Sequence, residues 1–509
     1  MNQYALAIRD EAQKLIRRFE LYAHDLADET TRRRRRTTAS VARLRPIRPL
    51  YWAIQDGFDP YLVRARSERI GHAIGQSIRR REYVPRIPIE YLVPKAGGGL
   101  RKVSVFQVAD NAVSRIVFRS LLEKNRSKMS SRSYAYRDDL TAHDAVQYIR
   151  SEFRQRDRMF IAEYDFSSYF DAISHDHIWE TIEEQQFLMT ASEKHVAQAF
   201  LTSQAVVIGG YGESSPAARS NGVPQGTSIS LILANLAAWP LDRALERLGV
   251  GFARYADDTL IWSADYGQIC AAADVLHEQS RLIGAPVNLL KSAGIRLLVA
   301  PGAPAEIEHT HHVDFVGHNL TLHSTGIKAE TVMRIKKRLA ELLYFNLVRE
   351  PLRGTQDLGR LDGRVDRDYV VFIWQARRFL YGDLSEVELR RFQVDDVPLR
   401  RFKGMMSFYP LIDDTDALRD LDSWLASRTW MALRRRGLLL RKMGLTVLPP
   451  PHGMPANRLI KYRRRSATTG GTLDLRMPSL GRIATLLRRA SAIHGPNQIG
   501  RVRQYGSYG

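Results

Sequence analysis

Two adjacent aspartates inside an apolar stretch constrain this chain more than any other feature. The stretch reads RYADDTLIW over residues 254–262, and it sets Asp257 and Asp258 between a tyrosine and a run of Leu, Ile and Trp. Such a pair is costly near a core, because the two carboxylates repel each other and both favour water. The stretch therefore forms either a polar turn between two strands or a site that holds a cation.

A third carboxylate has similar surroundings. Residues 158–173, RMFIAEYDFSSYFDAI, begin with a strand pattern, carry Asp165 near the end of that strand and continue into a helix. If this strand neighbours the one around Asp257 in a sheet, the two carboxylates face each other and need cations to stay ionised. Mg²⁺ prefers such oxygen ligands, with Mn²⁺ as a substitute, and two such ions form the metal site of nucleotidyl transfer.

The overall charge favours a polyanionic partner. Among 509 residues, 76 Lys and Arg oppose 55 acids, for a net charge of +21. Nucleic acid is the simplest such partner, and the alternative is a basic surface that serves solubility. A single cysteine, Cys270, excludes internal disulfides and fits a reducing cytosol. The most apolar stretch, 229–241, is shorter than the ~20 residues that span a bilayer, so we expect no membrane segment.

The hydropathy pattern changes along the chain. Residues 2–28 have helical spacing, the middle alternates strands with helices, and the part after about residue 325 is mainly helical. Five consecutive arginines in TTRRRRRTT, 30–38, form either a solvated mobile loop or a segment that a polyanion orders. Residues 461–509 hold ten Lys and Arg against one acid, which predicts a partly flexible basic tail.

The carboxylates belong to a longer ordered set of motifs. In chain order these are VPKAGGGLRKVSV, YDFSSYFDAISHD, NGVPQGTSISLILAN, RYADD and DFVGHNL. Together they resemble the fingers and palm motifs of reverse transcriptases, over about residues 83–325. The resemblance is greatest to bacterial enzymes of the group II intron, retron and phage-defence lineages. Two departures, Ser167 in place of a lysine and Leu231 in place of a proline, set the chain apart from the intron-encoded branch.

This resemblance implies an α+β fold shaped like a right hand. A palm with an antiparallel sheet carries the carboxylates, and fingers and a helical thumb flank it. The expected ranges are a basic helical N-terminal extension over 1–80, fingers over 81–157 with a return over 185–220, a palm over 158–325, a helical thumb over 326–450 and a basic C-terminal extension or tail over 451–509.

The resemblance also assigns roles at the metal site. It implies that Asp165 and Asp257 are metal ligands, together with the backbone carbonyl of Phe166, and that Asp258 supports the metal site or the primer end. Phe170, five residues after Asp165, matches the aromatic steric gate that excludes a ribose 2′-hydroxyl. The alternative for Phe170 is an ordinary core aromatic.

Further matched positions are implied to bind the nucleotide and the primer. Lys95 and Arg101 flank a glycine-rich turn over the triphosphate, with a solvated hairpin tip as the alternative. Lys291 matches a lysine proposed as general acid for pyrophosphate, with a surface lysine as the alternative. The remaining matches are Gln225 as a nucleotide contact, Gly222 and Gly226 as points of close backbone approach, and Gly317 at the turn of the primer grip.

The implied activity is RNA-directed DNA polymerisation, with two Mg²⁺ ions, dNTPs, an RNA template and a DNA product. The lack of a cysteine-rich endonuclease points to cytoplasmic anti-phage defence with a structured non-coding RNA as template. Alternatives are a retron-type enzyme, a template-independent or RNA-synthesising nucleotidyltransferase, and a catalytically silent RNA-binding scaffold. A homo-oligomer, a zinc site at His309, His311 and His312, and protein priming from Tyr505 or Tyr508 also stay open.

Overall fold

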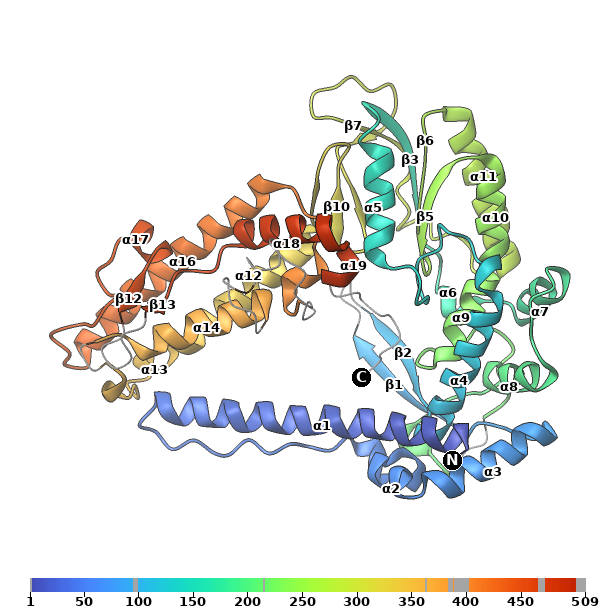
Figure 1. The fold of residues 1–509 in the computed structure, drawn as a ribbon, viewed down its shortest axis with the longest axis horizontal. Coiled ribbons are helices and arrows are strands. Elements are labelled where there is room, and N and C mark those ends of the chain that lie inside the picture. The colour runs from blue at the N-terminus through green and yellow to red at the C-terminus, as the bar shows by residue number, and fades with distance from the viewer. Residues whose placement is uncertain are drawn as a thin grey trace.

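A five-stranded sheet in the order β5-β6-β3-β7-β8 lies at the centre of the chain (Figure 1). Neighbouring strands are antiparallel, except that β8 runs parallel to β7. The strands are β3 Arg158–Tyr164, β5 Gly251–Tyr255, β6 Asp258–Ser263, β7 Gly294–Val299 and β8 His309–Thr310. The fold is a computed structural model that describes residues 2–94, 99–213, 216–361, 364–382, 388, 402–465 and 472–499.

Both faces of this sheet are covered by helices, and the alternation of side chains along β3 shows why. Phe160 and Ala162 belong to a core shared with the helices on one face, whereas Met159 and Ile161 belong to a core shared with α5 on the other. Successive side chains of a strand point to opposite faces of the sheet, so a strand whose consecutive residues are all apolar must be buried on both faces. The covering helices are α5 Ala142–Phe153, α9 Ser228–Ala237, α10 Trp239–Leu248 and α11 Tyr266–Ile283.

A second sheet, in the order β2-β1-β4, lies below the first in Figure 1. Strands β1 and β2 form the antiparallel hairpin expected around the glycine-rich turn, of which Lys95 lies outside the described residues. This part consists of β1 Ile89–Pro94, β2 Leu100–Val105, β4 Val206–Val207, α4 Val108–Asn125, α7 His175–Glu184 and α8 Ala191–Leu201. Most of these elements fall within the ranges expected for the fingers, whereas α7 falls within the range expected for the palm.

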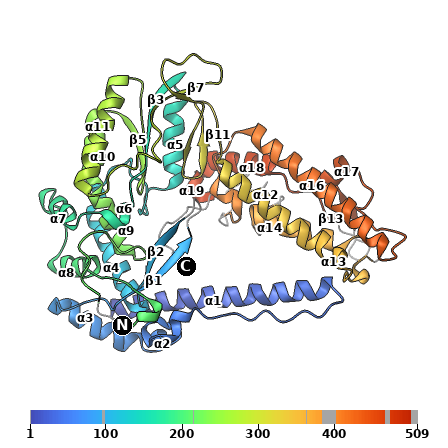
Figure 2. The same cartoon turned by 180° about the vertical axis from the view of Figure 1, so that it is seen from behind.

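The third part is mainly helical and has its own apolar core. A small three-stranded sheet links it to the palm (Figure 2). Its elements are β9 Val313–Phe315, β10 His318–Leu320, β11 Thr325–Ile327, α12 Ala329–Leu343, the π-helical turn η5 Tyr344–Val348, α13 Arg349–Leu352, α14 Arg367–Tyr381 and α16 Thr415–Lys442. The predicted α+β class and the arrangement of fingers, palm and helical thumb are thus confirmed.

The arginine run is helical, so of the two alternatives left open the solvated loop is wrong, and the segment is ordered by contacts within the chain. Helix α1, Gln3–Arg36, continues through all five arginines, and Glu29 bridges Arg32, Arg33 and Arg36. Its first half packs on α2 Pro60–Ala65, α3 Ser67–Arg80 and α4, and its last turn reaches the thumb (Figure 1). One glutamate that neutralises part of the charge, together with this anchorage, explains why the repulsion does not melt the helix.

The C-terminal residues are also more ordered than their composition suggests. Within 472–499, helix α18 Leu480–His494 packs its buried Leu480, Ile483 and Leu487 into the thumb core. Helix α19 Pro496–Ile499 reaches back to α5, where Asn497 donates to Asp144 at 2.9 Å. Residues 472–499 are thus an ordered part of the expected C-terminal extension, with more order than the predicted partly flexible tail, whereas Tyr505 and Tyr508 lie outside the described residues.

In the described part of the chain, no helix is both long enough and apolar enough to cross a membrane.

Candidate functional site

The three predicted carboxylates meet at one end of the central sheet. Tyr164 pairs with Thr259 in the β3–β6 register, so Asp165, one residue later, lies beside Asp258, one residue earlier. Tyr255 pairs with Asp258 in the β5–β6 hairpin, which puts Asp257 in its turn. The sheet thus brings together Asp165 and Asp257, which are 92 residues apart (257 − 165), and meets the condition that the sequence hypothesis required.

The carboxylates perturb one another. Burial raises the pKa of Asp257, and the charge of Asp165 raises it further, whereas Arg101 and Arg254 oppose the rise. Burial, Asp257 and Asp165 raise the pKa of Asp258 to about 7. Because Asp258 is exposed to solvent, the like charges of Asp257 and Asp165 are the firmer cause of this rise in pKa. A bound proton or a bound cation would therefore stabilise this cluster of carboxylates.

The turn that carries Asp257 has an unusual backbone. Ala256 has φ of +64°, a left-handed conformation that costs a non-glycine residue roughly 1–2 kcal/mol. Beneath it, the buried guanidinium of Arg254 donates to the Ala256 carbonyl at 3.0 Å and binds Asp242 with two hydrogen bonds of 2.6 and 2.7 Å. Asn235 also accepts from Arg254 at 3.1 Å. This buried network fixes the shape of the turn.

Asp165 is held by the segment that follows α11. Its backbone N–H donates to Ser292 Oγ at 3.1 Å, and its carbonyl accepts from the Asn288 N–H at 2.8 Å. Phe166 faces Val287 in an isolated antiparallel bridge. The hydrogen bonds of this bridge are made by the neighbouring residues, so they use neither the N–H nor the carbonyl of Phe166. The geometry therefore leaves the Phe166 carbonyl outside the backbone pairing at the site where the resemblance implies a metal ligand.

Lys291 comes from the same segment. Its Nζ lies 3.6 Å from Asp165 Oδ2, with 65% of the lysine side chain and 33% of the aspartate side chain exposed. An exposed pair of this kind contributes little to stability. Lys291 therefore lies beside Asp165 and presents its positive charge from a largely exposed side chain.

Phe170 is half-buried between two other rings. Its ring centroid lies 5.7 Å from that of Tyr169, with the rings perpendicular, and 6.3 Å from that of Tyr136. Its backbone carbonyl accepts from the N–H of Val223 at 2.7 Å. Phe170 is therefore fixed by the palm core while part of its ring stays accessible, which a steric gate requires.

The VPQG segment is attached to both the palm and the fingers. The carbonyl of Gln225 accepts from the Ser104 N–H at 2.6 Å, and its side chain donates to Asp171 Oδ1 at 3.4 Å. Gly226 has φ of +125°, and a Cβ there would lie 2.3 Å from the Ser104 carbonyl oxygen. The glycine thus allows close approach between segments of this chain, a contact that the sequence did not reveal.

The remaining predicted residues lie on the two flanks. Arg101 is exposed on β2, and its charge acts on Asp257. Gly317 has φ of +82° in the turn between β9 and β10, and its carbonyl accepts from the Lys328 N–H at 3.1 Å. The Nζ of Lys328 lies 3.7 Å from Asp314, and its charge opposes the pKa rise of Asp258. The turn at Gly317 is therefore linked to the carboxylates through a lysine.

Three supporting residues were not predicted. Arg254 stood inside the RYADD motif, and an arginine between apolar residues before an Asp pair was a usable signal. Tyr136 and Lys328 carried no such signal, because only the folded chain brings them to Phe170 and Asp258.

The donor set suits a hard divalent cation. Asp165, Asp257 and Asp258 provide carboxylate oxygens, the charge of Asp165 raises the pKa of the other two, and the carbonyl of Phe166 is adjacent. In the described chain no three His, Cys, Asp or Glu side chains converge as a complete ligand set. Mg²⁺ takes few ligands from protein and the rest from water and substrate phosphates, so these residues fit it.

The site lies inside a region with a clear family match. Residues 93–320 match the family described as Reverse transcriptase (RNA-dependent DNA polymerase). Protein YkfC of Escherichia coli (strain K12) is 27% identical over 207 residues, which cover 39% of this chain and 51% of that protein. The chain thus matches about half the length of this curated relative. The three carboxylates thus lie within the segment that matches the reverse transcriptase family.

Solved structures with a related fold include two yeast telomerases. Apo telomerase from Candida tropicalis has a TM-score of 0.39 and 12% identity, over 81% of this chain and 64% of that one. Telomerase from Candida albicans, in complex with the TWJ fragment of telomeric RNA, has a TM-score of 0.36 and 14% identity, over 80% of this chain and 68% of that one. At these scores the likeness is distant.

Proposed function

We propose that this chain, whose residues 93–320 match the reverse transcriptase family, extends a primer 3′-hydroxyl with dNTPs on an RNA template. The observation that supports this most is the meeting of Asp165 with Asp257 and Asp258 at one end of β3 and β6. The neighbouring carboxylates raise the pKa values of Asp257 and Asp258, so the cluster needs cations to stay ionised, and nucleotidyl transfer uses both metal ions and phosphates. The net charge of +21 fits a nucleic-acid substrate.

Asp165, Asp257 and the carbonyl of Phe166 would hold two Mg²⁺ ions, with Asp258 beside them. When bound, such ions lower the pKa of the primer hydroxyl and neutralise the pyrophosphate leaving group. Arg254 and Ser292 act as positioning residues, because they fix the backbone on either side of the site. Their hydrogen bonds keep the carboxylates aligned before substrate arrives.

Other residues would act on the nucleotide. Arg101, with Lys95 from the same hairpin, neutralises the triphosphate. Phe170 occupies the space of a ribose 2′-hydroxyl and thereby favours dNTPs. Lys291, whose ammonium group lies beside Asp165, would donate a proton to the pyrophosphate leaving group. Gln225 contacts the nucleotide from the VPQG segment.

The partition of the chain is part of the same proposal. Residues 81–157 and 185–220 serve as fingers, 158–325 as palm and 326–450 as thumb, with basic extensions over 1–80 and 451–509. Gly317 marks the primer grip. The extensions would hold a structured non-coding RNA that serves as template, and the biological role would be anti-phage defence in the bacterial cytoplasm. This last step rests on family analogy.

Primer extension on an RNA template with Mg²⁺ and labelled dNTPs tests the activity. Neutralising the pair, Asp257→Asn with Asp258→Asn, should abolish extension. A second adjacent pair offers a matched control: Asp138 and Asp139 form ion pairs with Arg126 and Arg137, outside the carboxylate cluster. Asp138→Asn with Asp139→Asn removes the same charge and should keep extension. Full activity of the 257/258 variant would refute the site, and incorporation without RNA would refute the template requirement.

A further inference from the structure

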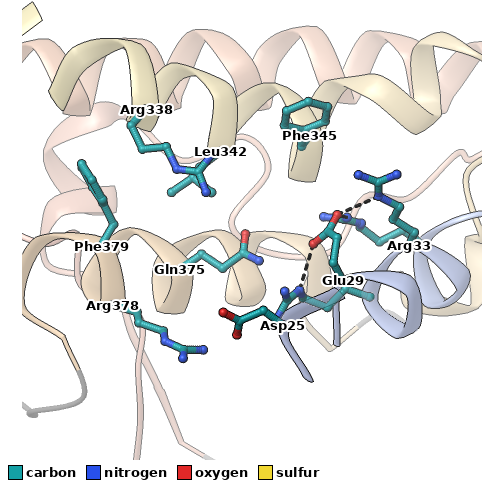
Figure 3. A pocket seen from close by; sticks show the side chains of 11 residues that line it. Asp25, Glu29, Arg33, Arg338, Leu342, Phe345, Gln375, Arg378 and Phe379 are labelled. Atoms are coloured by element: carbon teal, nitrogen blue, oxygen red, sulfur yellow. Dashed lines mark hydrogen bonds and ion pairs between the residues drawn. The ribbon is translucent and has the colours of Figure 1, made fainter. Parts of the chain in front are cut away.

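A cavity of about 530 Å³ lies between α1 and the thumb, away from the carboxylates. Three elements surround it: the C-terminal part of α1, the α12–η5 segment and α14 (Figure 3). Its volume is within the range of about 300–1,000 Å³ that holds a ligand of nucleotide size. The cavity exists because α1 crosses from the fingers and docks its last turn on the thumb.

That docking is specific, which makes the walls well defined. The buried Arg36 donates to Asn346 Oδ1 at 2.5 Å, and Asn346 in turn donates to Gln375 Oε1 at 2.7 Å. Beyond the helix, Thr37 pairs with Gln356 in an antiparallel bridge. The three elements are thus linked by buried polar contacts, and the side chains around the cavity start from fixed backbones.

The lining combines guanidinium groups with aromatic rings. Five arginines line the cavity against two acids, Asp25 and Glu29; the arginines are Arg32, Arg33, Arg36, Arg338 and Arg378. Glu29 accepts from Arg33 at 2.8 Å and from Arg32 at 3.2 Å, so this acid gathers the guanidinium groups and leaves an excess of positive charge. Phe345, 39% exposed, and Phe379 lie on the thumb side of the same cavity (Figure 3).

We propose that this cavity binds one nucleotide unit of a single-stranded RNA, with its phosphate on Arg32 and Arg33 and its base against Phe345. Arginine forks suit phosphate oxygens, and an exposed aromatic ring stacks any base, which is the combination used by proteins that bind single strands. The choice of RNA rests on the proposed function, in which the template strand beyond the palm is single-stranded RNA while DNA leaves within a duplex.

Equilibrium binding of a labelled single-stranded RNA of about 10 nucleotides to the full chain tests this site. Arg32→Ala with Arg33→Ala should weaken binding about tenfold and lower the slope of log K against log salt by about 1.4, since each lost contact to a single strand accounts for about 0.7. The same run contains a matched control. Arg34 and Arg35 are exposed and lie outside this cavity, so Arg34→Ala with Arg35→Ala removes equal charge and should change binding far less.

Phe345→Ala keeps every charge and should weaken binding severalfold without changing the salt slope, because it removes only the stacking contact. The proposal would be overturned if the two double arginine variants lost equal RNA affinity, or if Phe345→Ala bound RNA as tightly as the wild type. Binding of AMP as tight as that of the RNA would show a site for free nucleotides, and tighter binding of single-stranded DNA would contradict the assigned strand. If loss of Arg32 and Arg33 lowers the melting temperature, Arg338→Ala tests the same cavity from the exposed opposite wall.

These measurements are independent of polymerisation. The Asp257→Asn, Asp258→Asn variant should lose extension but keep RNA binding with the unaltered salt slope. RNA binding that depends on Arg32 and Arg33 in a chain without any extension activity would refute the proposed function alone. Extension by a chain that binds RNA equally with and without these arginines would refute the cavity alone.

Discussion

Arg254 Nη2 lies 2.6 Å from Asp242 Oδ2, and each side chain is only 2% exposed. Burial alone would lower the pKa of Arg254, but the contact with Asp242 outweighs it and raises that pKa. The same guanidinium donates to the carbonyl of Ala256, directly before Asp257. A buried ion pair therefore supports the strained turn that carries the predicted metal ligand, and stability and activity are linked at one residue.

Replacing this arginine should affect both properties. We expect Arg254→Met to lower the free energy of unfolding by about 3–5 kcal/mol, because Asp242 would be buried without its partner. Urea unfolding measures this loss, and primer extension should fall as well. The double variant Arg254→Met with Asp242→Leu removes the orphaned charge and should regain most of the stability. Extension should stay low in it, because Ala256 still lacks its donor; recovered extension would show that Arg254 serves the fold alone.

Asp258 should make the stability of the metal-free protein depend on pH. Its pKa is raised to about 7 in the folded chain, against about 4 when unfolded. Between these values the native state binds a proton that the unfolded chain has lost, so the free energy of unfolding falls as pH rises from about 4 to 7. In EDTA, melting temperatures should therefore fall more steeply over this range in the wild type than in Asp258→Asn.

Mg²⁺ provides the complementary test for this carboxylate. Above about pH 7 the charged cluster should bind the ion and regain the lost stability, so Mg²⁺ should raise the melting temperature of the wild type more than that of Asp258→Asn. Equal pH slopes in the two proteins, or an equal response to Mg²⁺, would contradict the assignment.

Phe170 should set the choice of sugar. Phe170→Val removes the ring while Tyr136 and Tyr169 keep the surrounding packing. We expect the preference for dNTPs over rNTPs, measured as the ratio of kcat/KM values, to fall about 10- to 200-fold, the range for one steric contact. Phe166→Leu is a control, because Phe166 is a buried aromatic of the same motif. A loss of stability without a change in this ratio would make Phe170 an ordinary core residue.

The sequence revealed the residues of the candidate site more completely than the residues that hold them in place. Strand patterns predicted that Asp165 and Asp257 each follow a strand, because period-two burial is a local signal, but the pairing of those strands was only a hypothesis. The state of the arginine run stayed open because its order depends on Asn346, more than 300 residues away. The degree of order in residues 472–499 was underestimated for the same reason: their charge composition predicts a partly flexible tail, but Leu480 and Ile483 are buried only once α16 is in place. Tertiary contacts decided both cases.

Gly226 should be irreplaceable because of a contact between the fingers and the palm. Gly226→Ala would put a Cβ 2.3 Å from the Ser104 carbonyl oxygen at a φ of +125°. We expect a loss of about 3 kcal/mol or more in the free energy of unfolding, since backbone strain adds to a clash with backbone. Gly249→Ala is the matched control, because Gly249 also has positive φ, +71°, but open space around it. It should lose only about 1–2 kcal/mol. If the two variants lost equal free energy of unfolding in urea, backbone strain alone would explain the effect. A larger loss at Gly226, accompanied by weaker nucleotide binding, would show that the Ser104 contact holds Gln225 in place.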